Sequence, residues 1–251
     1  MERPDRDVVA TFFVPDEALV PGATVSLGES VARHVRVLRY GVGNLVQLTD
    51  GAGRRAAATI VRLTRDMVAT QVQTVEEVAA PPAVHLMVPV ADRDRMLWLA
   101  EKAAELGATS WRPVTWRRSR SVMPRGEGPS FSGKIRARMA AALEQSRGAH
   151  LPMLFPEATP ERAVAAAPDG TRVVLDPDGT ALVALDLSAP VTLAVGPEGG
   201  LETGELRLLE QGGFVRASLG RAILRFETAA VAALAITRSV LHARRGVSNG
   251  Y

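Results

Sequence analysis

The hydrophobic pattern of the chain changes at Pro81-Pro82, and this change limits the possible folds more than any other feature. Before the two prolines, short strand-like runs are separated by turn segments such as "GVGN" and "DGAG". After them, apolar strand-like runs alternate with helical stretches, the pattern of a parallel sheet with helices on its faces. We therefore expect two domains, a small β-barrel over residues 1–78 and an α/β domain over residues 83–251.

The expected elements follow from the same periodicities. Strands are expected in the first domain at residues 8–14, 23–28, 45–51, 55–64 and 67–77, and in the second at residues 83–90, 109–115, 171–177, 191–196 and 214–220. Helices are expected at residues 92–107, 133–148 and 227–245, the first with Gly107 as its C-cap. The second domain is thus predicted to have the α/β fold class.

Composition excludes several kinds of protein. The sequence has no cysteine, so neither a disulfide nor a thiolate metal site is possible, and four scattered histidines make a zinc site an unfavourable hypothesis. No apolar run approaches the roughly 20 residues that a membrane-spanning helix needs, and the N-terminus "MERPDRD" is charged. We expect a cytoplasmic protein without a membrane segment or a metal.

Charge is distributed in blocks along the chain. Residues 93–138 carry eleven basic and four acidic side chains, residues 139–215 carry four and eleven, and residues 216–251 carry six and one. Basic blocks favour a polyanion such as a nucleic acid as partner, because neutralised phosphates release counterions. The alternative is a general arginine bias, since 28 of the 30 basic residues are arginine.

Three strand ends carry Gly or Pro, in "VVLDPDG", "LAVGPEGG" and "ASLGRAIL". Ligands of open α/β sheets bind at the carboxyl ends of the strands, so these segments are expected to form one pocket. None matches G-x-G-x-x-G or G-x-x-x-x-G-K-[ST], so neither a dinucleotide nor a triphosphate is the expected ligand. The backbone groups of such a loop could instead bind a purine edge or a zwitterion.

Two segments in chain order, "LAVGPEGGLETGEL" and "SLGRAILRFETAAVAALA", resemble the signatures of the RsmE family. The segments "HVRVLRYGVGN", "EKAAELGA" and "ALEQSRGAHLP" are similar to the same family. This family consists of SPOUT-superfamily methyltransferases that use S-adenosylmethionine to methylate N3 of a uridine, uridine 1498, in 16S rRNA of the small ribosomal subunit. The resemblance implies a PUA-like RNA-binding β-barrel, a deep trefoil knot in the second domain and a homodimer.

The resemblance also implies which residues hold the cofactor. They belong to the three loops, whose glycines allow the main chain to approach adenine and ribose closely. The implied cofactor-binding residues are Leu175, Asp176, Pro177, Val195, Gly196, Pro197, Glu198, Gly199, Gly200, Ser218, Leu219, Gly220, Ile223 and Leu224.

The sequence departs from the family pattern "LGPRILRTETA" at Arg221, Ala222 and Phe226. A phosphate or cofactor contact could move to Arg221, and Phe226 could stack on a base. After "GPEGGL" the family has Ser or Thr as a helix N-cap, where this chain has Glu202. We expect Thr203 to cap instead.

The reaction requires N3 of the uridine to lose a proton, so a base or a stabilising cation is needed. Arg225 and Glu227 are the catalytic candidates: the arginine would stabilise the uridine anion or bind its phosphate, and the carboxylate would orient that arginine or take the proton. Alternatively, Glu227 is a favourable charge at a helix N-terminus. Glu198 could equally hydrogen-bond backbone N–H groups within its own loop.

Candidate RNA contacts are polar and basic residues of both domains, any of which could be ordinary surface. They are His34, Arg36, Arg39, Arg117, Arg118, Arg120, Gln145 and Arg147. Trp98 and the methionines at helical spacing are expected in the core or a dimer interface. Two other functions stay open: a SPOUT enzyme that acts on another RNA such as tRNA, and an RNA-binding protein without turnover.

Overall fold

The structure, a computed structural model, describes residues 10–15, 19–121 and 125–248. The chain forms two compact units. Unit 1 contains the chain up to Ala80 and the segment Leu143–Leu151, and unit 2 contains Pro81–Ala142 and the chain from Pro152 onward. The later segment joins unit 1 through hydrogen bonds such as that from the backbone N–H of Phe13 to Oε1 of Glu144, at 2.8 Å.

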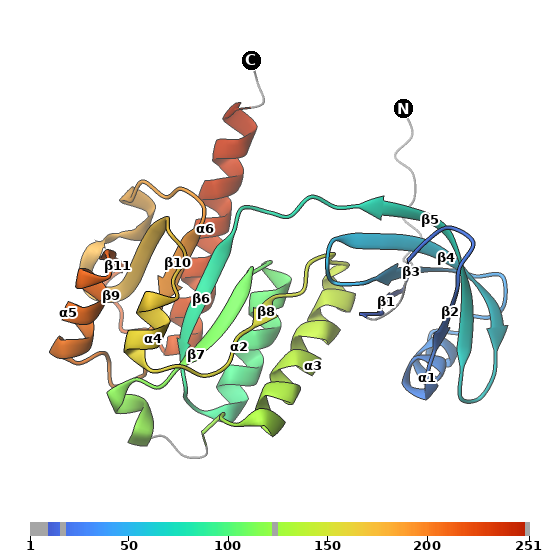
Figure 1. The fold of residues 1–251 in the computed structure, drawn as a ribbon, viewed down its shortest axis with the longest axis horizontal. Helices are drawn as coiled ribbons and strands as arrows, with labels where there is room; N and C mark the ends of the chain where they lie inside the picture. The colour runs from blue at the N-terminus through green and yellow to red at the C-terminus, as the bar shows by residue number, and fades with distance from the viewer. Residues whose placement is uncertain (1–9, 16–18, 122–124, 249–251) are drawn as a thin grey trace. The chain divides into compact units, whose positions relative to one another are not determined.

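Unit 1 is built on a curled five-stranded sheet that resembles a half-barrel (Figure 1). In spatial order the strands are β1 (Thr11–Phe13), β3 (Leu45–Thr49), β4 (Arg54–Leu63), β5 (Val68–Glu77) and β2 (Thr24–Leu27). All neighbouring pairs are antiparallel except β1 and β3. Phe12, Leu48 and Ile60 are buried in its core. The strand-rich first part of the chain is confirmed.

Unit 1 also contains a helix that the sequence analysis did not anticipate, α1 (Glu29–Val37). Ala32 and Val35 are its buried residues, three positions apart on one face. The segment is only nine residues long, but Val31, Ala32 and Val35 have the spacing of one helical face, a signal that the sequence reasoning did not use. The exposed side chains of His34 and Arg36 lie on this helix.

Unit 2 contains a six-stranded sheet in which every neighbouring pair is parallel. In spatial order the strands are β11 (Phe214–Ser218), β9 (Thr171–Ala181), β10 (Val191–Ala194), β6 (Val84–Pro89), β7 (Ser110–Val114) and β8 (Met153–Leu154). The predicted α/β fold class is confirmed. The trefoil knot stays a prediction of the resemblance.

Helices cover both faces of this sheet. They are α2 (Arg93–Glu105), α3 (Pro129–Ser146), α4 (Pro160–Ala165), α5 (Thr203–Gln211) and α6 (Phe226–Ser248), with short 3-10 turns η1 (Arg117–Ser121) and η2 (Leu182–Ala184). Helix α6 packs on α2, β6 and β10, whereas α4 packs on α5 and β7. Figure 1 shows α4 and α5 in front of the sheet and α6 behind it.

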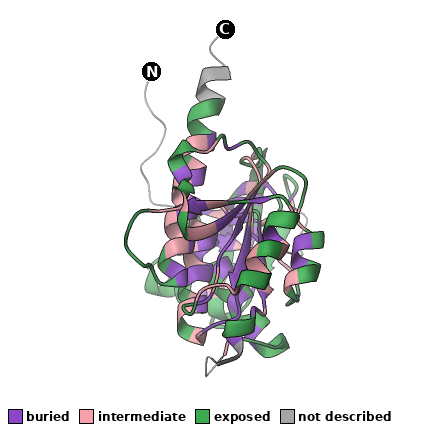
Figure 2. Cartoon of the chain, turned by 90° about the vertical axis from the view of Figure 1, so that its left-hand side faces the viewer, coloured by how far each residue is buried: buried purple, intermediate pink, exposed green. Residues whose placement is uncertain are grey.

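The two helical layers explain why the central strands are buried along most of their length rather than at alternating positions. All four residues of β10 are buried, as is typical of a parallel strand covered on both sides. Figure 2 shows these buried strands in purple between helices whose outer faces are green. Strands β7 and β8 lie beyond β6, while β9 and β11 lie beyond β10. The chain therefore changes direction across the sheet between β6 and β10, where ligand sites commonly form.

No helix in the described ranges has the length and apolar character required to cross a membrane.

Candidate functional site

Three segments at one edge of the parallel sheet surround a cavity of about 260 Å³. One follows β10, one lies within β9 and one follows β11. Because these three strands are parallel neighbours, their carboxyl ends reach the same edge of the sheet. The predicted convergence of the three glycine- and proline-containing segments is therefore observed.

The structure brings all the predicted cofactor residues except Gly199 to the lining of this cavity. The glycine at 199 lies against another group: its carbonyl oxygen accepts a hydrogen bond from Arg118, and a Cβ atom there would be 3.1 Å from Cδ of that arginine. Further lining residues, which the sequence analysis did not name as cofactor contacts, are Leu201, Leu206, Ala217, Ala222, Phe226 and Ala229.

The segment containing Leu175–Pro177 is not a loop at the end of a strand, as the sequence suggested, but an irregularity inside β9. Strand β11 pairs Arg216 with Val174 and then Ala217 with Thr180, so residues 175–179 of β9 are looped out of the ladder. A Cβ atom on Gly179 would be 2.5 Å from the backbone nitrogen of Ala217. The strand thus resumes beyond the bulge because the two backbones approach closely there.

The charged residues of the cavity lining are acidic, and each is paired with an arginine that does not line the cavity. Among the described residues that line it, Asp176 and Glu198 are acidic and none is basic. Asp176 is anchored, because its Oδ1 accepts the backbone N–H of Asp178 at 2.9 Å and its Oδ2 lies 3.7 Å from Nη1 of Arg216. A lining without cations is unsuited to a phosphate and suits a neutral or cationic ligand.

Two glycines of the cavity have backbone angles that other residues rarely adopt. Gly200 has φ +74° and Gly220 has φ +131°, and both line the cavity. A Cβ atom on Gly220 would meet no atom within 4 Å, so the requirement for glycine there comes from the backbone conformation and not from crowding.

The helix that follows the "GPEGG" loop begins differently from the sequence expectation. Glu202, not Thr203, is the N-cap of α5, with extended backbone angles of φ −77° and ψ 157°. Its N–H donates to Oε2 of Glu205 at 2.8 Å, so a carboxylate three residues on satisfies the capping position. Oε1 of Glu205 also accepts the backbone N–H of Arg117 at 2.7 Å, which ties η1 to the start of α5.

Two residues hold the loop after β10 from outside the cavity. The indole N–H of buried Trp116 donates to the carbonyl oxygen of Val195 at 3.0 Å. Arg118 donates to the carbonyl oxygen of Gly199 and lies 4.0 Å from the carboxylate of Glu202. Arg118, expected as an RNA contact, therefore has a role in the loop itself.

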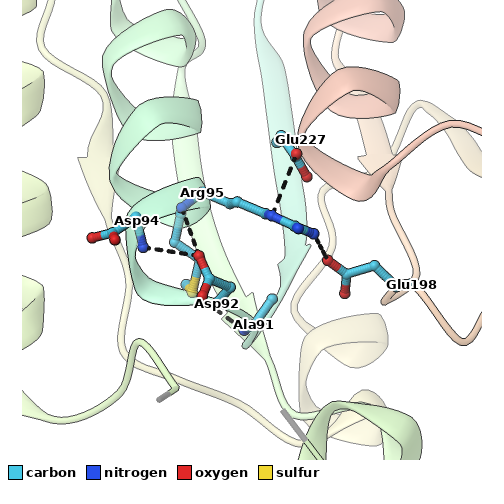
Figure 3. Close-up of polar contacts among 7 residues, drawn as sticks. Ala91, Asp92, Asp94, Arg95, Glu198 and Glu227 are labelled. Carbon is cyan, nitrogen blue, oxygen red and sulfur yellow. Dashed lines mark hydrogen bonds and ion pairs between the residues drawn. The ribbon is translucent and has the colours of Figure 1, made fainter. Parts of the chain in front are cut away.

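The two catalytic candidates lie at the start of α6 but in different environments. Glu227 is 8% exposed, whereas Arg225 is exposed. The described ion pair of Glu227 is with Arg95, whose Nε is 3.8 Å from Oε1, and not with Arg225 (Figure 3). Oε2 of Glu227 is buried and has no hydrogen-bond partner among the described residues. A buried carboxylate oxygen without a donor can accept a proton or an N–H group.

Glu198 joins the same cluster. Its Oε1 accepts a hydrogen bond from Nη1 of Arg95 at 2.5 Å, and not from the backbone N–H groups of its own loop (Figure 3). Sequence reasoning missed Arg95. The available signal was a basic residue in the first turn of a helix that starts at a strand end, where a cation opposes the helix macrodipole.

The residues that depart from the family pattern have clear positions. Phe226, at the start of α6, is 2% exposed and lines the cavity, so its ring belongs to the predicted cofactor site and not to the exposed surface. Ala222 also lines the cavity. Arg221 is exposed and is not among the described residues that line the cavity, so its contact with a phosphate or the cofactor stays a prediction.

Most candidate RNA contacts are exposed. In unit 1 these are His34, Arg36, Arg39, Gln145 and Arg147, and in unit 2 they are Arg117 and Arg118. The side chain of Arg120 lies outside the described part of the structure. Met96 is buried in the core, as predicted. Trp98 is 44% exposed and is therefore not a core residue, so its place in a dimer interface stays a prediction. The described residues contain no group of three acidic or histidine side chains that could bind a metal ion.

Comparison with known proteins gives consistent matches. A family model described as "RNA methyltransferase domain" matches residues 79–238. The chain is 30% identical over 246 residues to the ribosomal RNA small subunit methyltransferase E of Mycobacterium bovis, covering 90% of each chain. It is 28% identical over 223 residues to the protein of that name from Bacillus subtilis, covering 82% of this chain and 86% of the relative.

Two similar solved structures contain S-adenosylmethionine. The ribosomal RNA small subunit methyltransferase E of Neisseria gonorrhoeae, bound to this molecule, has a TM-score of 0.84 at 27% identity and covers 92% of this chain and 98% of its own. The putative methyltransferase Lpg2936 of Legionella pneumophila, in complex with the same cofactor, has a TM-score of 0.82 at 28% identity, with coverages of 94% and 98%.

Proposed function

The chain belongs to the RsmE family of ribosomal RNA small subunit methyltransferases, and on this premise we propose that it methylates N3 of uridine 1498 in 16S rRNA with S-adenosylmethionine as methyl donor. The observation that carries the proposal is the cavity at the edge of the parallel sheet, with two acidic and no basic residues in its described lining. A positively charged sulfonium group is favoured in such a site, and a phosphate is not.

The residues of the three cavity segments would hold the cofactor. The backbone of Val195–Gly200 and of Ser218–Leu224 offers N–H and C=O groups at positions where glycine permits close approach. Apolar side chains such as Leu201 and Phe226 offer a surface for the adenine ring. S-adenosylmethionine supplies an electrophilic methyl group in this site.

We propose that Glu227 is the base. As the N3–H bond of the uridine breaks, the proton passes to Oε2 of Glu227, and the N3 electron pair forms the new bond to carbon as the bond from sulfur to the methyl group breaks. The buried, unpartnered position of Oε2 supports this assignment, because an N–H group there would gain an acceptor shielded from water.

Arg225 has a separate role in the proposal. It precedes α6 with an exposed side chain, next in sequence to a residue of the cavity lining. A guanidinium at this position would stabilise the negative charge that develops on the uridine ring or bind the adjoining phosphate.

RNA binding is assigned to His34, Arg36 and Arg39 of the domain proposed for residues 1–78, to Gln145 and Arg147 of the later segment of unit 1, and to Arg117, Arg118 and Arg120 of the basic segment. Both sets would contact phosphates of the small subunit RNA. The homodimer and the cytoplasmic location, where ribosomal subunits are assembled, belong to the same proposal.

The test is incubation of the purified protein with labelled S-adenosylmethionine and small ribosomal subunits that lack the modification, followed by mapping of the methylated nucleotide. We expect one methyl group at N3 of the uridine. Transfer to tRNA, or to another position of the uridine, would contradict the proposed substrate. Cofactor binding without transfer to any RNA would indicate an RNA-binding protein without turnover.

A further inference from the structure

Arg95 occupies a defined place at the point where the strand order of unit 2 reverses. Helix α2 begins directly after β6, with Asp92 as N-cap: its Oδ1 accepts the backbone N–H groups of Asp94 and Arg95, each at 3.1 Å. This cap fixes Arg95 in the first turn of α2. The neighbouring strand β10 ends in the glycine-containing loop of the cavity, so the arginine lies beside that loop.

The guanidinium of Arg95 joins carboxylates from two other segments. Nη1 lies 2.5 Å from Oε1 of Glu198, in the loop after β10, and Nε lies 3.8 Å from Oε1 of Glu227, in the first turn of α6. Figure 3 shows the side chain extending from α2 between the two glutamates. Three segments distant in sequence thus meet at one cation.

Helix stability does not account for this arrangement. A cation in the first turn of a helix is repelled by the positive end of the macrodipole, so Arg95 weakens α2 unless it has acidic partners. Glu227, in contrast, is favourably placed at the start of α6 and is buried, so it needs a countercharge. The position of Arg95 is explained by its ion pairs, which connect the loop after β10 to the start of α6.

The link leaves one oxygen of Glu227 available. Arg95 approaches Oε1, and Oε2 remains buried without a partner among the described residues. At the other end, Glu198 lines the cavity. Without the Arg95 side chain, the cavity loop with Glu198 and the buried carboxylate of Glu227 could move independently of each other.

We propose that Arg95 is a positioning residue that holds the Glu198 loop and the Glu227 carboxylate in one fixed geometry. The bound methyl donor and the group that takes the proton are then correctly placed relative to each other. This inference rests on the proposed function for its kinetic consequence, but its binding consequence is independent of the RNA substrate. Arg95 acts through the two glutamates and needs no contact with either substrate.

The first experiment measures binding of S-adenosylmethionine by titration calorimetry for wild type, Arg95→Ala, Glu198→Gln and the double variant. We expect each single change to weaken binding about tenfold and the double variant to bind no more weakly than the singles, because residues of one network are not additive. Additive losses, or wild-type affinity in Arg95→Ala, would overturn the link to the loop.

The second experiment measures single-turnover methyl transfer at saturating cofactor. Arg95→Ala should lower the rate about 100-fold, the scale of a displacement of about 1 Å between reacting groups. Arg95→Lys should recover part of the rate, since it keeps the charge but not the planar fork. Adding Arg95→Ala to Glu227→Gln should cause little further loss. A wild-type rate at saturating cofactor, or equal rates for the Lys and Ala variants, would overturn the proposal.

Arg93→Ala is the matched control, an arginine of the same turn whose guanidinium lies over the Phe131 ring, 5.4 Å from its centroid. It should keep wild-type binding and rate. The midpoint temperature of thermal unfolding shows whether a variant has only a structural defect. The positioning role would be contradicted if Arg95→Ala had a much lower midpoint than Arg95→Lys but transferred methyl groups at the normal rate below that midpoint. If wild type transfers no methyl group to any RNA, the proposed function fails, and the binding experiment still decides the role of Arg95.

Discussion

Unit 2 contains a buried glutamate, Glu227, and unit 1 a half-buried one, Glu144, and the two are stabilised by different means. In unit 2, Glu227 has an arginine as its partner and keeps one oxygen free of hydrogen bonds among the described residues. In unit 1, Glu144 accepts the backbone N–H of Phe13, and burial raises the pKa of its carboxyl group, an effect that this hydrogen bond and His34 reduce. An arrangement with an unused oxygen suits proton transfer, whereas a carboxylate bonded to the backbone suits a structural connection.

The surroundings of the two glutamates differ in the same way. Unit 2 encloses a cavity with acidic lining residues, while the candidate ligand-binding residues of unit 1 are exposed and mostly basic. A small cationic ligand is best held by an enclosed site with defined acceptors, and a polyanion by an open surface of cations. On the proposed function, we expect methyl transfer to take place in unit 2 and part of the RNA affinity to come from unit 1, and the following variants test this division.

The largest effect is expected from Glu227→Gln. The amide keeps the shape of the side chain but cannot take the proton, so the single-turnover rate should fall by about 10²–10⁴-fold with little change in cofactor affinity. Quench-flow measurement with labelled cofactor gives the rate. A fall below tenfold would remove Glu227 as the base and make it resemble Glu144.

Arg225→Ala should abolish detectable multiple-turnover transfer, with a loss of about 10²–10³-fold, while the protein stays folded, because a cation that stabilises developing charge is removed. Circular dichroism checks the fold and a methyl-transfer assay the activity. Arg207→Ala removes an exposed arginine from α5 and is expected to behave as wild type. Wild-type turnover in Arg225→Ala would remove that arginine from the mechanism.

Gly220→Ala should weaken S-adenosylmethionine binding about tenfold, because φ +131° costs a non-glycine residue about 1–3 kcal/mol and the loop would relax away from the cavity. Calorimetric titration measures the affinity. Gly204→Ala, within α5 and with open space around its Cβ position, is the control and should bind normally. Equal affinities for both variants would contradict a cofactor role for this segment.

In unit 1, the double change Arg36→Gln and Arg39→Asn should raise the KM for the RNA substrate a few-fold and leave cofactor affinity unchanged. Asparagine is chosen because Arg39 has φ +60°, which it tolerates well. The slope of log affinity against log salt should decrease by about 0.7 for each phosphate that the variant no longer neutralises. An unchanged slope would show that these arginines do not bind the RNA backbone.

The smallest effect is expected from Glu144→Gln. Since the folded-state pKa of Glu144 is raised, protonation favours the folded state at low pH, and this contribution is lost as pH rises through that pKa. The glutamine variant lacks this dependence, so wild type should lose stability relative to it between about pH 3 and about pH 7, by less than about 1 kcal/mol because water screens the partly exposed group. Urea unfolding across that range measures the difference, and the opposite slope would contradict the raised pKa.

The alternation of apolar strand-like runs and helical stretches after Pro82 was sufficient to predict the parallel sheet. A strand such as "VTLA" does not alternate between apolar and polar residues, as expected when helices cover both faces. Glycine and proline at the strand ends likewise predicted a shared pocket, since parallel strands bring their carboxyl ends to one edge. Helix α1 was missed although Val31, Ala32 and Val35 are spaced as one helical face, because the segment is only nine residues long and lies among strand-like runs. The extension of β9 beyond its bulge was missed because it depends on pairing with β11.

Local sequence was enough to predict the sheet and the convergence of the glycine-containing segments, because periodicity and backbone conformation are encoded residue by residue. Which charges meet depends instead on the folded chain. Arg95 and Glu198 are 103 positions apart in the sequence, and they pair only because β6 and β10 become neighbours. Likewise, Glu202 became the cap of α5 through Glu205, and Arg118 was drawn to Gly199. Such pairings depend on the packing of distant segments, which no local pattern specifies.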